Sequence, residues 1–345
     1  MHGFVSLMGQ ETLVQRLQQA IISGRVAHAY LITGAPGSGK KTLAVAFAQA
    51  LFCTEQPGTA CGTCRNCRRV EARNHPDMIV IEPDGGRIKI DQVRDLKDRF
   101  SLQAYEGRWK VGIIVGAETM TVEAANSLLK LLEEPSGQAV IMLLSASPSM
   151  LLPTIVSRCQ RIAMKPIPRQ LIASFLEREY GLSPETALVI AGLADGRLGQ
   201  AKELAQGPNL ARIEEIRSAL VGRESPGLKA LRLAAELDAE PEALEFALQV
   251  VVTWLRDMLL LALGCDRQVM VHQDRYEELL EQSRLYSPSA IMQAVWQVEV
   301  AARALKGNAN RRLTLDALFY QLADLNSSSR ASEVYKYGKS SGSQI

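Results

Sequence analysis

The sequence lacks any long run of uncharged apolar residues and carries little net charge. Its 39 lysines and arginines are nearly balanced by 37 aspartates and glutamates, which leaves a formal net charge of +2. No segment approaches the roughly 20 apolar residues that a membrane-spanning helix needs. The first residues, 1–6, lack the basic-then-apolar order of a secretory signal peptide. We therefore expect a cytoplasmic protein, and any contact with nucleic acid would have to come from a local basic patch.

Residues 29–44 predict a short apolar strand, a glycine-rich turn and the start of a helix, which is the order of a phosphate-binding P-loop. The glycines let the backbone turn tightly and aim its N–H groups inward, the helix adds its positive N-terminal end, and a lysine supplies a mobile cation. The residues predicted to bind nucleotide are Gly34, Gly37, Ser38, Gly39, Lys40, Lys41 and Thr42.

Two groups that a hydrolytic P-loop needs are missing from the sequence. Lys41 stands where a serine or threonine would hold Mg²⁺, and Thr42 is one residue late, a step that turns a helical side chain by about 100°. The third predicted strand ends in Val115 and Gly116 instead of Asp-Glu, and Glu118 lies further along. We expect no efficient Mg²⁺-dependent hydrolysis. The loop either binds ATP, ADP or phosphate, or remains only as a strand-to-helix connection.

Four cysteines, Cys53, Cys61, Cys64 and Cys67, include two consecutive x2 spacings. Such spacing suits tetrahedral thiolate coordination of Zn²⁺ and predicts a closed structural site with no open position for catalysis. A cytoplasmic location disfavours disulfides, and no second motif supports an iron–sulfur cluster. His75 is either a substitute ligand or an ordinary turn histidine.

The same segment is rich in arginine, at positions 65, 68, 69 and 73. We interpret these side chains as a solvated face, with contact to nucleic-acid phosphates as the alternative.

Alternating apolar strands and helices over residues 1–165 predict an α/β domain with a doubly wound parallel sheet, with the cysteine module at 53–67. Beyond Pro166 the strand pattern ends, and three short helices predict a small helical domain over 166–208. A further all-α region follows over 209–325, in which we expect Trp254 and Trp296 to be core residues. The small polar residues of 326–345 predict a disordered tail. Cys159 and Cys265 are expected to be buried.

Several motifs spread over nearly the whole chain resemble one family. They are Gly9-Gln10, residues 28–31, the loop at 34–42, the four cysteines, residues 74–77, residues 126–135, Ser157-Arg158-Cys159, residues 254–257 and residues 308–313. Together they resemble the delta-prime subunits of the bacterial clamp loader of DNA polymerase III, within the AAA+ ATPases. The resemblance implies a RecA-like AAA+ domain with a zinc module, a helical lid and a C-terminal helical collar that oligomerises.

The resemblance also implies partners and a role. Clamp-loader subunits form a hetero-pentameric ring, which here would contain tau/gamma and delta subunits and would load the sliding clamp on primer-template DNA. In that ring Arg158 would be an arginine finger, acting in trans on a neighbour's ATP. The alternative for Arg158 is a structural ion pair at a helix end. The chain itself would be a hydrolysis-deficient, non-catalytic subunit of the polymerase, which is a nucleotidyltransferase complex.

Two other functions remain open from the sequence. The first is an active tau/gamma-type ATPase that uses Glu118 and Thr42 in unusual geometry. Motor subunits of that type place a further arginine at a position that corresponds here to about Gly199, with Arg197 two residues away. The second is a zinc-dependent DNA-binding protein that contacts duplex through the arginine-rich module.

Overall fold

A computed structural model of the chain describes residues 3–106, 108–133, 137–221, 241–307 and 309–322. The chain divides into two compact units. The first unit comprises Met1–Leu171 together with Asp195–Gln200, and the second comprises Ile172–Ala194 together with Ala201–Ile345.

The first unit is built on one parallel sheet. Its strands are β1 (Ala29–Thr33), β2 (Met78–Ile81), β3 (Lys110–Val115), β4 (Ala139–Ser145) and β5 (Gln160–Ala163). Their order in the sheet is β2-β3-β4-β1-β5, and all four pairings are parallel. Parallel strands require crossover connections, and helices supply most of them here.

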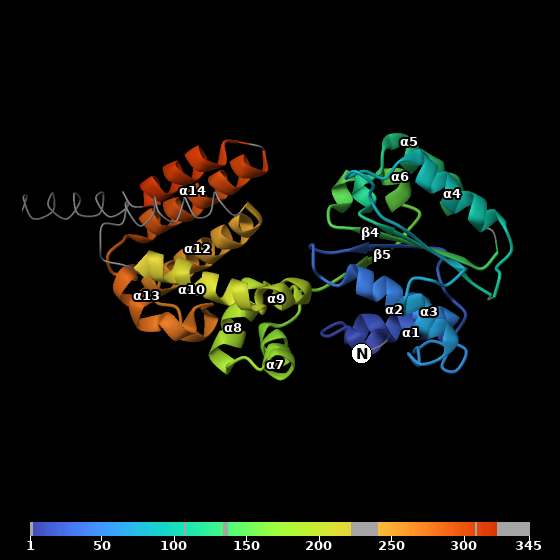
Figure 1. Ribbon diagram of the computed structural model, residues 1–345, viewed down its shortest axis with the longest axis horizontal. Coiled ribbons are helices and arrows are strands. Elements are labelled where there is room, and N and C mark those ends of the chain that lie inside the picture. The colour runs from blue at the N-terminus through green and yellow to red at the C-terminus, as the bar shows by residue number, and fades with distance from the viewer. Residues whose placement is uncertain (1–2, 107, 134–136, 222–240, 308, 323–345) are drawn as a thin grey trace, which may run out of the picture. The chain divides into compact units, whose positions relative to one another are not determined.

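Helices cover both faces of this sheet (Figure 1). They are α1 (Glu11–Ile22), α2 (Lys40–Phe52), α3 (Arg65–Glu71), α4 (Ile90–Ser101), α5 (Val122–Glu133) and α6 (Pro153–Val156), with 3₁₀ turns η1 (Gly3–Ser6), η2 (Ala117–Thr119) and η3 (Pro148–Met150). Helices α1, α2 and α3 lie on one side, and α4, α5 and α6 lie on the other. The doubly wound α/β fold predicted from the alternating pattern is therefore confirmed.

The two faces form two separate cores because successive side chains of a strand alternate. Tyr30 and Ile32 of β1 join the core that contains Phe47 of α2. Leu31, between them, joins the opposite core with Leu128 of α5. A buried parallel strand needs apolar residues on both faces, which explains the continuous apolar runs in the sequence.

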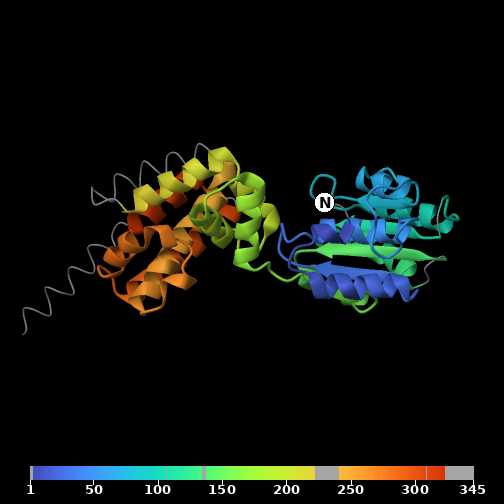
Figure 2. The same ribbon diagram turned by 90° about the horizontal axis from the view of Figure 1, so that it is seen from below.

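From residue 169 onward every regular element that the structure describes is helical (Figures 1 and 2). The helices are α7 (Arg169–Tyr180), α8 (Pro184–Leu193), α9 (Leu198–Leu204), α10 (Gly207–Val221), α12 (Pro241–Ala262), α13 (Tyr276–Ser283) and α14 (Pro288–Lys306), with 3₁₀ turns η4 (Arg267–Val269) and η5 (Gln273–Arg275). Residues 311–322 are also helical. The predicted all-α second half is confirmed for the described residues.

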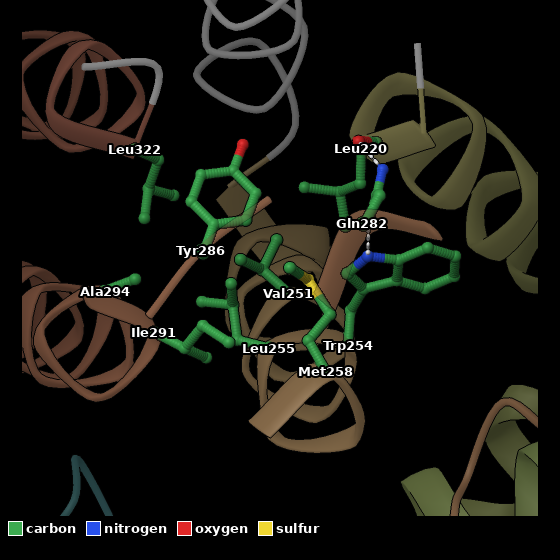
Figure 3. Close-up of a pocket in the computed structure, with 10 residues that line it drawn as sticks. All are labelled: Leu220, Val251, Trp254, Leu255, Met258, Gln282, Tyr286, Ile291, Ala294 and Leu322. Carbon is green, nitrogen blue, oxygen red and sulfur yellow. Dashed lines mark hydrogen bonds between the residues drawn. The ribbon is translucent and has the colours of Figure 1, made fainter. Parts of the chain in front are cut away.

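Helix α12 is the centre of the second unit. Its Trp254 is 1% exposed, and the indole Nε1–H donates a hydrogen bond to Gln282 Oε1 at 2.9 Å. Gln282 Nε2 in turn donates to the backbone oxygen of Leu220 at 2.9 Å, so one amide links α10, α12 and α13 (Figure 3). A small, mostly apolar cavity lies beside these side chains, between α12 and Ile291 of α14.

Two sequence predictions about burial are wrong. Trp296 is 59% exposed because it lies on the face of α14 that the described helices leave uncovered, whereas Trp254 is core as predicted. Cys265 is exposed, since it follows the end of α12, and Cys159 is half-buried. The division of the helical half into domains at 166–208 and 209–325 stays a prediction. The tail predicted for 326–345 lies outside the described residues.

A candidate P-loop, a cysteine cluster and an arginine

The predicted P-loop joins β1 to α2, and its glycines adopt backbone conformations that other residues avoid. Gly37 has a φ of 75° and Gly39 has a φ of 90°. Gly39 is the N-cap of α2, so the positive end of the helix begins at the loop. The local sequence thus builds the shape of a phosphate-binding loop.

Lys40 is folded back onto this loop. Its ammonium group donates to the backbone oxygens of Gly34 at 2.6 Å and Ala35 at 2.8 Å. Burial lowers the pKa of Lys40, and the nearby carboxylate of Glu118 partly offsets that effect. The Ser38 hydroxyl is buried in the loop, and its Oγ has no hydrogen-bond partner among the described residues. A phosphate would satisfy this hydroxyl and offer Lys40 an alternative acceptor, so the loop fits an anion.

Lys41 points to the end of β2 and not into the loop. Its ammonium forms an ion pair with Glu82, which directly follows β2, and this hydrogen bond lowers the pKa of Glu82. Thr42 is exposed on α2. Lys41 is thus held by Glu82 while Thr42 faces solvent, and nucleotide binding by these two residues stays a prediction.

The carboxylate of Glu118 lies closer to the P-loop than the sequence suggested. Glu118 belongs to η2, immediately after β3, and its Oε1 accepts a hydrogen bond from the Ala146 amide at 3.0 Å. Its Oε2 is buried and has no partner among the described residues. Gly116 and Ala117, which directly follow β3, carry no functional group. Glu118 and Glu82 were not in the predicted site, although each follows a strand at the sheet edge that carries the P-loop.

Gly199, close to the position at which the resemblance implies an arginine in motor subunits, contacts the P-loop. The amide of Gly199 donates to the backbone oxygen of Gly37 at 3.2 Å. A Cβ atom at position 199 would lie 3.2 Å from that oxygen and 3.3 Å from the Gly37 Cα. A side chain at 199 would therefore crowd the Gly37 backbone, which would have to move by a few tenths of an ångström.

The four predicted metal ligands converge. The sulfur atoms of Cys53, Cys61, Cys64 and Cys67 all lie within 4.8 Å of one another. Tetrahedral sulfurs around zinc are about 3.8 Å apart, given Zn–S bonds of about 2.3 Å, so the cluster fits this ion. The Cys64 amide donates to Cys61 Sγ at 3.3 Å and lowers the pKa of Cys61 to about 6, whereas burial raises the pKa of Cys67.

The cysteine cluster is fixed to the rest of the unit by a buried glutamine. Gln49 of α2 is 3% exposed, and its Nε2 donates to the backbone oxygen of Cys67 at 3.2 Å. Its Oε1 accepts from the Gly3 amide at 3.0 Å. Hydrogen bonds from residues that are not themselves ligands orient the ligands and support a metal site.

His75 is not part of the cluster. It is 3% exposed, its ring stacks on Phe52 at a centroid distance of 3.9 Å, and its Nδ1 accepts from the Asp77 amide at 3.2 Å. The ordinary turn histidine is therefore the better description.

Two of the arginines in the cysteine module are paired with carboxylates of the same unit. Arg69 forms an ion pair with Glu106, and Arg73 lies 3.5 Å from Glu82. Arg65 is 3.9 Å from Glu106 but is largely exposed. These pairs reduce the positive charge that the module offers to a nucleic acid.

Arg158 lies at the opposite edge of the sheet from the P-loop. Strands β1 and β5 run parallel, with Tyr30 opposite Gln160 and Thr33 opposite Ala163. The P-loop follows the end of β1, whereas Arg158 precedes the start of β5. By the same register Arg158 is level with position 28, two residues before Tyr30. Gly34 lies six residues beyond that position, which is about 20 Å along a strand. Arg158 therefore cannot serve the P-loop of its own chain.

The Arg158 side chain is half-buried and has two partners. Its Nη2 lies 2.6 Å from Glu133 Oε1, and its Nη1 donates to the backbone oxygen of Thr154 at 2.9 Å. The structural ion pair predicted as the alternative role of Arg158 is thus present in the isolated chain.

Comparison with known proteins decides the family. The family described as "DNA polymerase III, delta subunit" matches residues 9–168. The DNA polymerase III subunit delta' of Bacillus subtilis is 30% identical over 320 residues, which are 91% of this chain and 96% of that protein. The subunit delta' of Pseudomonas aeruginosa is 36% identical over 332 residues, 89% of this chain and 97% of that protein. The chain belongs to the DNA polymerase III delta' family.

The match to a tau subunit is shorter. The DNA polymerase III subunit tau of Salmonella typhimurium is 33% identical over 207 residues, which are 58% of this chain and 32% of that protein. End-to-end agreement with delta' proteins, together with the incomplete P-loop, separates the chain from the motor type. The AAA+ clamp-loader subunit indicated by the sequence motifs is confirmed. Among the described residues, no helix is both long and apolar enough to cross a membrane.

Proposed function

We propose that this chain is a hydrolysis-deficient clamp-loader subunit that supplies Arg158 to the ATP site of an adjacent subunit. The observation that carries the proposal is the separation of Arg158 from its own P-loop by the length of the parallel sheet. An arginine so placed is useful to a nucleotide only if that nucleotide belongs to another chain. There its permanent charge and planar donors would stabilise the charge that develops on the transferred phosphoryl group.

The proposed assembly follows from the family. In it the chain joins tau/gamma and delta subunits in a hetero-pentameric ring in the cytoplasm, and the ring opens the sliding clamp and loads it on primer-template DNA. Residues 209–325 would form the collar that holds the ring together, and residues 166–208 would form the lid. The chain contributes no ATP turnover of its own.

The proposed cofactors are one structural zinc and a nucleotide or phosphate that is not turned over. Cys53, Cys61, Cys64 and Cys67 would hold the zinc, which cross-links the segment between α2 and α3. Gly34, Gly37, Ser38, Gly39 and Lys40 would hold a phosphate of ATP or ADP. The Ser38 hydroxyl, which has no partner among the described residues, and the Lys40 ammonium, which lies against the loop, support this assignment.

The test is a set of arginine variants in the reconstituted complex. Arg158→Ala should lower DNA-stimulated ATP turnover about ten-fold or more at the site it serves, because the transition-state charge loses its partner. Arg158→Lys should recover little, since lysine lacks the planar fork. Arg161→Ala, an exposed arginine of β5, is the matched control and should leave turnover unchanged. Unchanged turnover by Arg158→Ala in an assembled complex would remove the proposed role.

The position of Glu118 favours one second candidate, a self-sufficient ATPase. Its carboxylate opposes the lowering of the Lys40 pKa, and one of its oxygens has no partner in the part of the chain that the structure describes, so it could orient a water. The missing Mg²⁺ ligand argues against it, and the absence of ATP turnover by the purified chain would exclude it. The pairing of Arg69 and Arg73 with carboxylates likewise weakens the alternative of a zinc-dependent DNA-binding protein. A weak, salt-insensitive DNA affinity of the chain alone would exclude that alternative.

A further inference from the structure

The guanidinium of Arg158 is held by two acceptors from two different helices. Glu133, the last residue of α5, accepts from Nη2, and the backbone oxygen of Thr154 in α6 accepts from Nη1. An arginine has five N–H donors, so these two contacts leave donors for a phosphate oxygen. The two anchors fix the direction in which the remaining donors point.

The position of Glu133 is electrostatically unfavourable for a carboxylate. The C-terminal end of a helix carries partial negative charge, which disfavours a negative side chain there. Its partner cation is Arg158, 25 positions later in the sequence. Both side chains are partly exposed, at 48% and 36%, and ion pairs of this kind contribute little to stability. The pair is therefore poorly explained by folding alone.

We propose that Glu133 is a positioning residue for Arg158, and this inference rests on the proposed function of Arg158. The carboxylate restricts the rotamers of a long side chain and presents its free donors to the neighbouring ATP in a fixed geometry. Orientation of this kind lowers the barrier to ATP hydrolysis, because the entropy of aligning the guanidinium with the phosphate is lost before the reaction begins. Glu133 itself does not contact the nucleotide.

Orientation by Glu133 can be separated from a simple charge effect. If the carboxylate acted as a negative charge that weakens the arginine, both Glu133→Gln and Glu133→Ala would raise ATP turnover. If it orients the guanidinium, Glu133→Gln keeps an acceptor oxygen at the same place and retains most of the activity. Glu133→Ala and Glu133→Met remove that oxygen, and methionine does so while keeping nearly the same length.

The experiment measures kcat and KM for DNA-stimulated ATP hydrolysis by the reconstituted complex. We expect Glu133→Ala and Glu133→Met to lower kcat about three-fold with an unchanged KM for ATP, since a partly exposed ion pair has an effect of this size. Glu133→Gln should recover most of the loss. The double variant Glu133→Ala/Arg158→Ala should match Arg158→Ala, because Glu133 acts only through that arginine. Asp95→Ala removes an exposed pair with Arg99 on α4 and is the control.

The outcomes separate the two proposals. A normal kcat for both Glu133→Ala and Glu133→Met, with an impaired Arg158→Ala, overturns the positioning role alone. A double variant slower than Arg158→Ala also overturns it, as does faster turnover by Glu133→Gln. A normal kcat for Arg158→Ala overturns the proposed function. Thermal unfolding of each variant chain and its yield in the complex identify a variant that fails to fold, and the methionine variant then replaces the alanine one.

Discussion

The amide of Gly199 donates a hydrogen bond to the backbone oxygen of Gly37 in the P-loop, at 3.2 Å. This contact closes the P-loop against the first turn of α9. Lys40 completes the closure by binding two carbonyl oxygens of the same loop. Three backbone oxygens of the P-loop are thus occupied, whereas the Ser38 hydroxyl has no hydrogen-bond partner among the described residues.

Gly199→Arg should not create an ATPase. The new Cβ would lie 3.2 Å from the Gly37 oxygen, so the loop must shift, and we expect a loss of about 1 kcal/mol in the free energy of unfolding. Turnover by the purified chain should stay at background because the groups that hold Mg²⁺ are still missing. Gln206→Arg, which adds one positive charge at an exposed position just after α9, is the control for the added charge. Measurable turnover by Gly199→Arg would contradict this account.

Lys41→Thr should make nucleotide binding dependent on Mg²⁺. The substitution restores the hydroxyl that a P-loop uses as a metal ligand and removes the ion pair with Glu82. We expect ATP to bind at least about five-fold more tightly in Mg²⁺ than in EDTA, a difference absent from the wild type. Calorimetric titration measures both. Lys41→Ala removes the same ion pair without supplying a hydroxyl, so an equal metal dependence in that variant would show the prediction to be wrong.

The cysteine cluster predicts about one zinc per chain. Cys61→Ser and Cys64→Ser should lose the metal and unfold at a lower temperature, because metal binding contributes to folding free energy. Elemental analysis and thermal unfolding provide the measurements. Cys265→Ser is the matched control, since Cys265 is exposed and lies outside the cluster. A folded wild-type chain that retains no metal through purification at neutral pH would be inconsistent with the zinc site.

His75 should make the stability of the chain fall at acidic pH. Burial lowers its pKa, so below the ordinary histidine pKa of about 6.5 the unfolded chain binds more protons than the folded one. Its contribution to stability is therefore complete above pH about 6.5 and is lost as the pH falls through the lowered value. His75→Asn keeps an acceptor for the Asp77 amide and should flatten this part of the profile. Denaturant unfolding between pH 7 and pH 5 measures the difference between the free energies of unfolding of the two proteins. Any loss of metal affects both proteins alike and therefore cancels in that difference.

The free energies of unfolding of the wild type and His75→Asn should fall in parallel only if His75 has the same pKa in the folded and the unfolded chain. Parallel profiles would therefore rule out the buried, neutral histidine. A steeper fall in the wild type alone would support it.

Asp257 should be required for the stability of the helical unit. Its carboxylate is fully buried and accepts hydrogen bonds from the amides of Val271 at 2.9 Å and His272 at 2.7 Å. Asp257→Ala should lower the free energy of unfolding by about 3 kcal/mol, because two buried donors lose their acceptor. Asp257→Asn, which keeps one acceptor oxygen, should lose less. Chemical denaturation measures both, and an effect below about 0.5 kcal/mol for alanine would contradict the assignment.

Local sequence was enough for the features whose residues are close together in the chain. The P-loop needs glycines and a lysine within seven positions, and the cysteine cluster needs four thiols within fifteen, so both are visible as spacing. The doubly wound sheet was predictable because buried parallel strands are continuous apolar runs. The burial of Trp254 and Trp296 could not be distinguished, since both lie on helices with apolar neighbours and only the packing of α12 and α14 separates them.

The sequence by itself determined the family, the fold class, the missing Mg²⁺ ligand and the set of cysteines, because each depends on residue types at short spacing. Only the tertiary structure decided which residues far apart in the sequence come into contact. It paired Lys41 with Glu82, brought Glu118 to Lys40, placed Gly199 against Gly37 and joined Arg158 to Glu133. The direction of the parallel strands decides where Arg158 lies relative to the P-loop, since it places the two at opposite edges of one sheet. That separation exists only when the strands are paired.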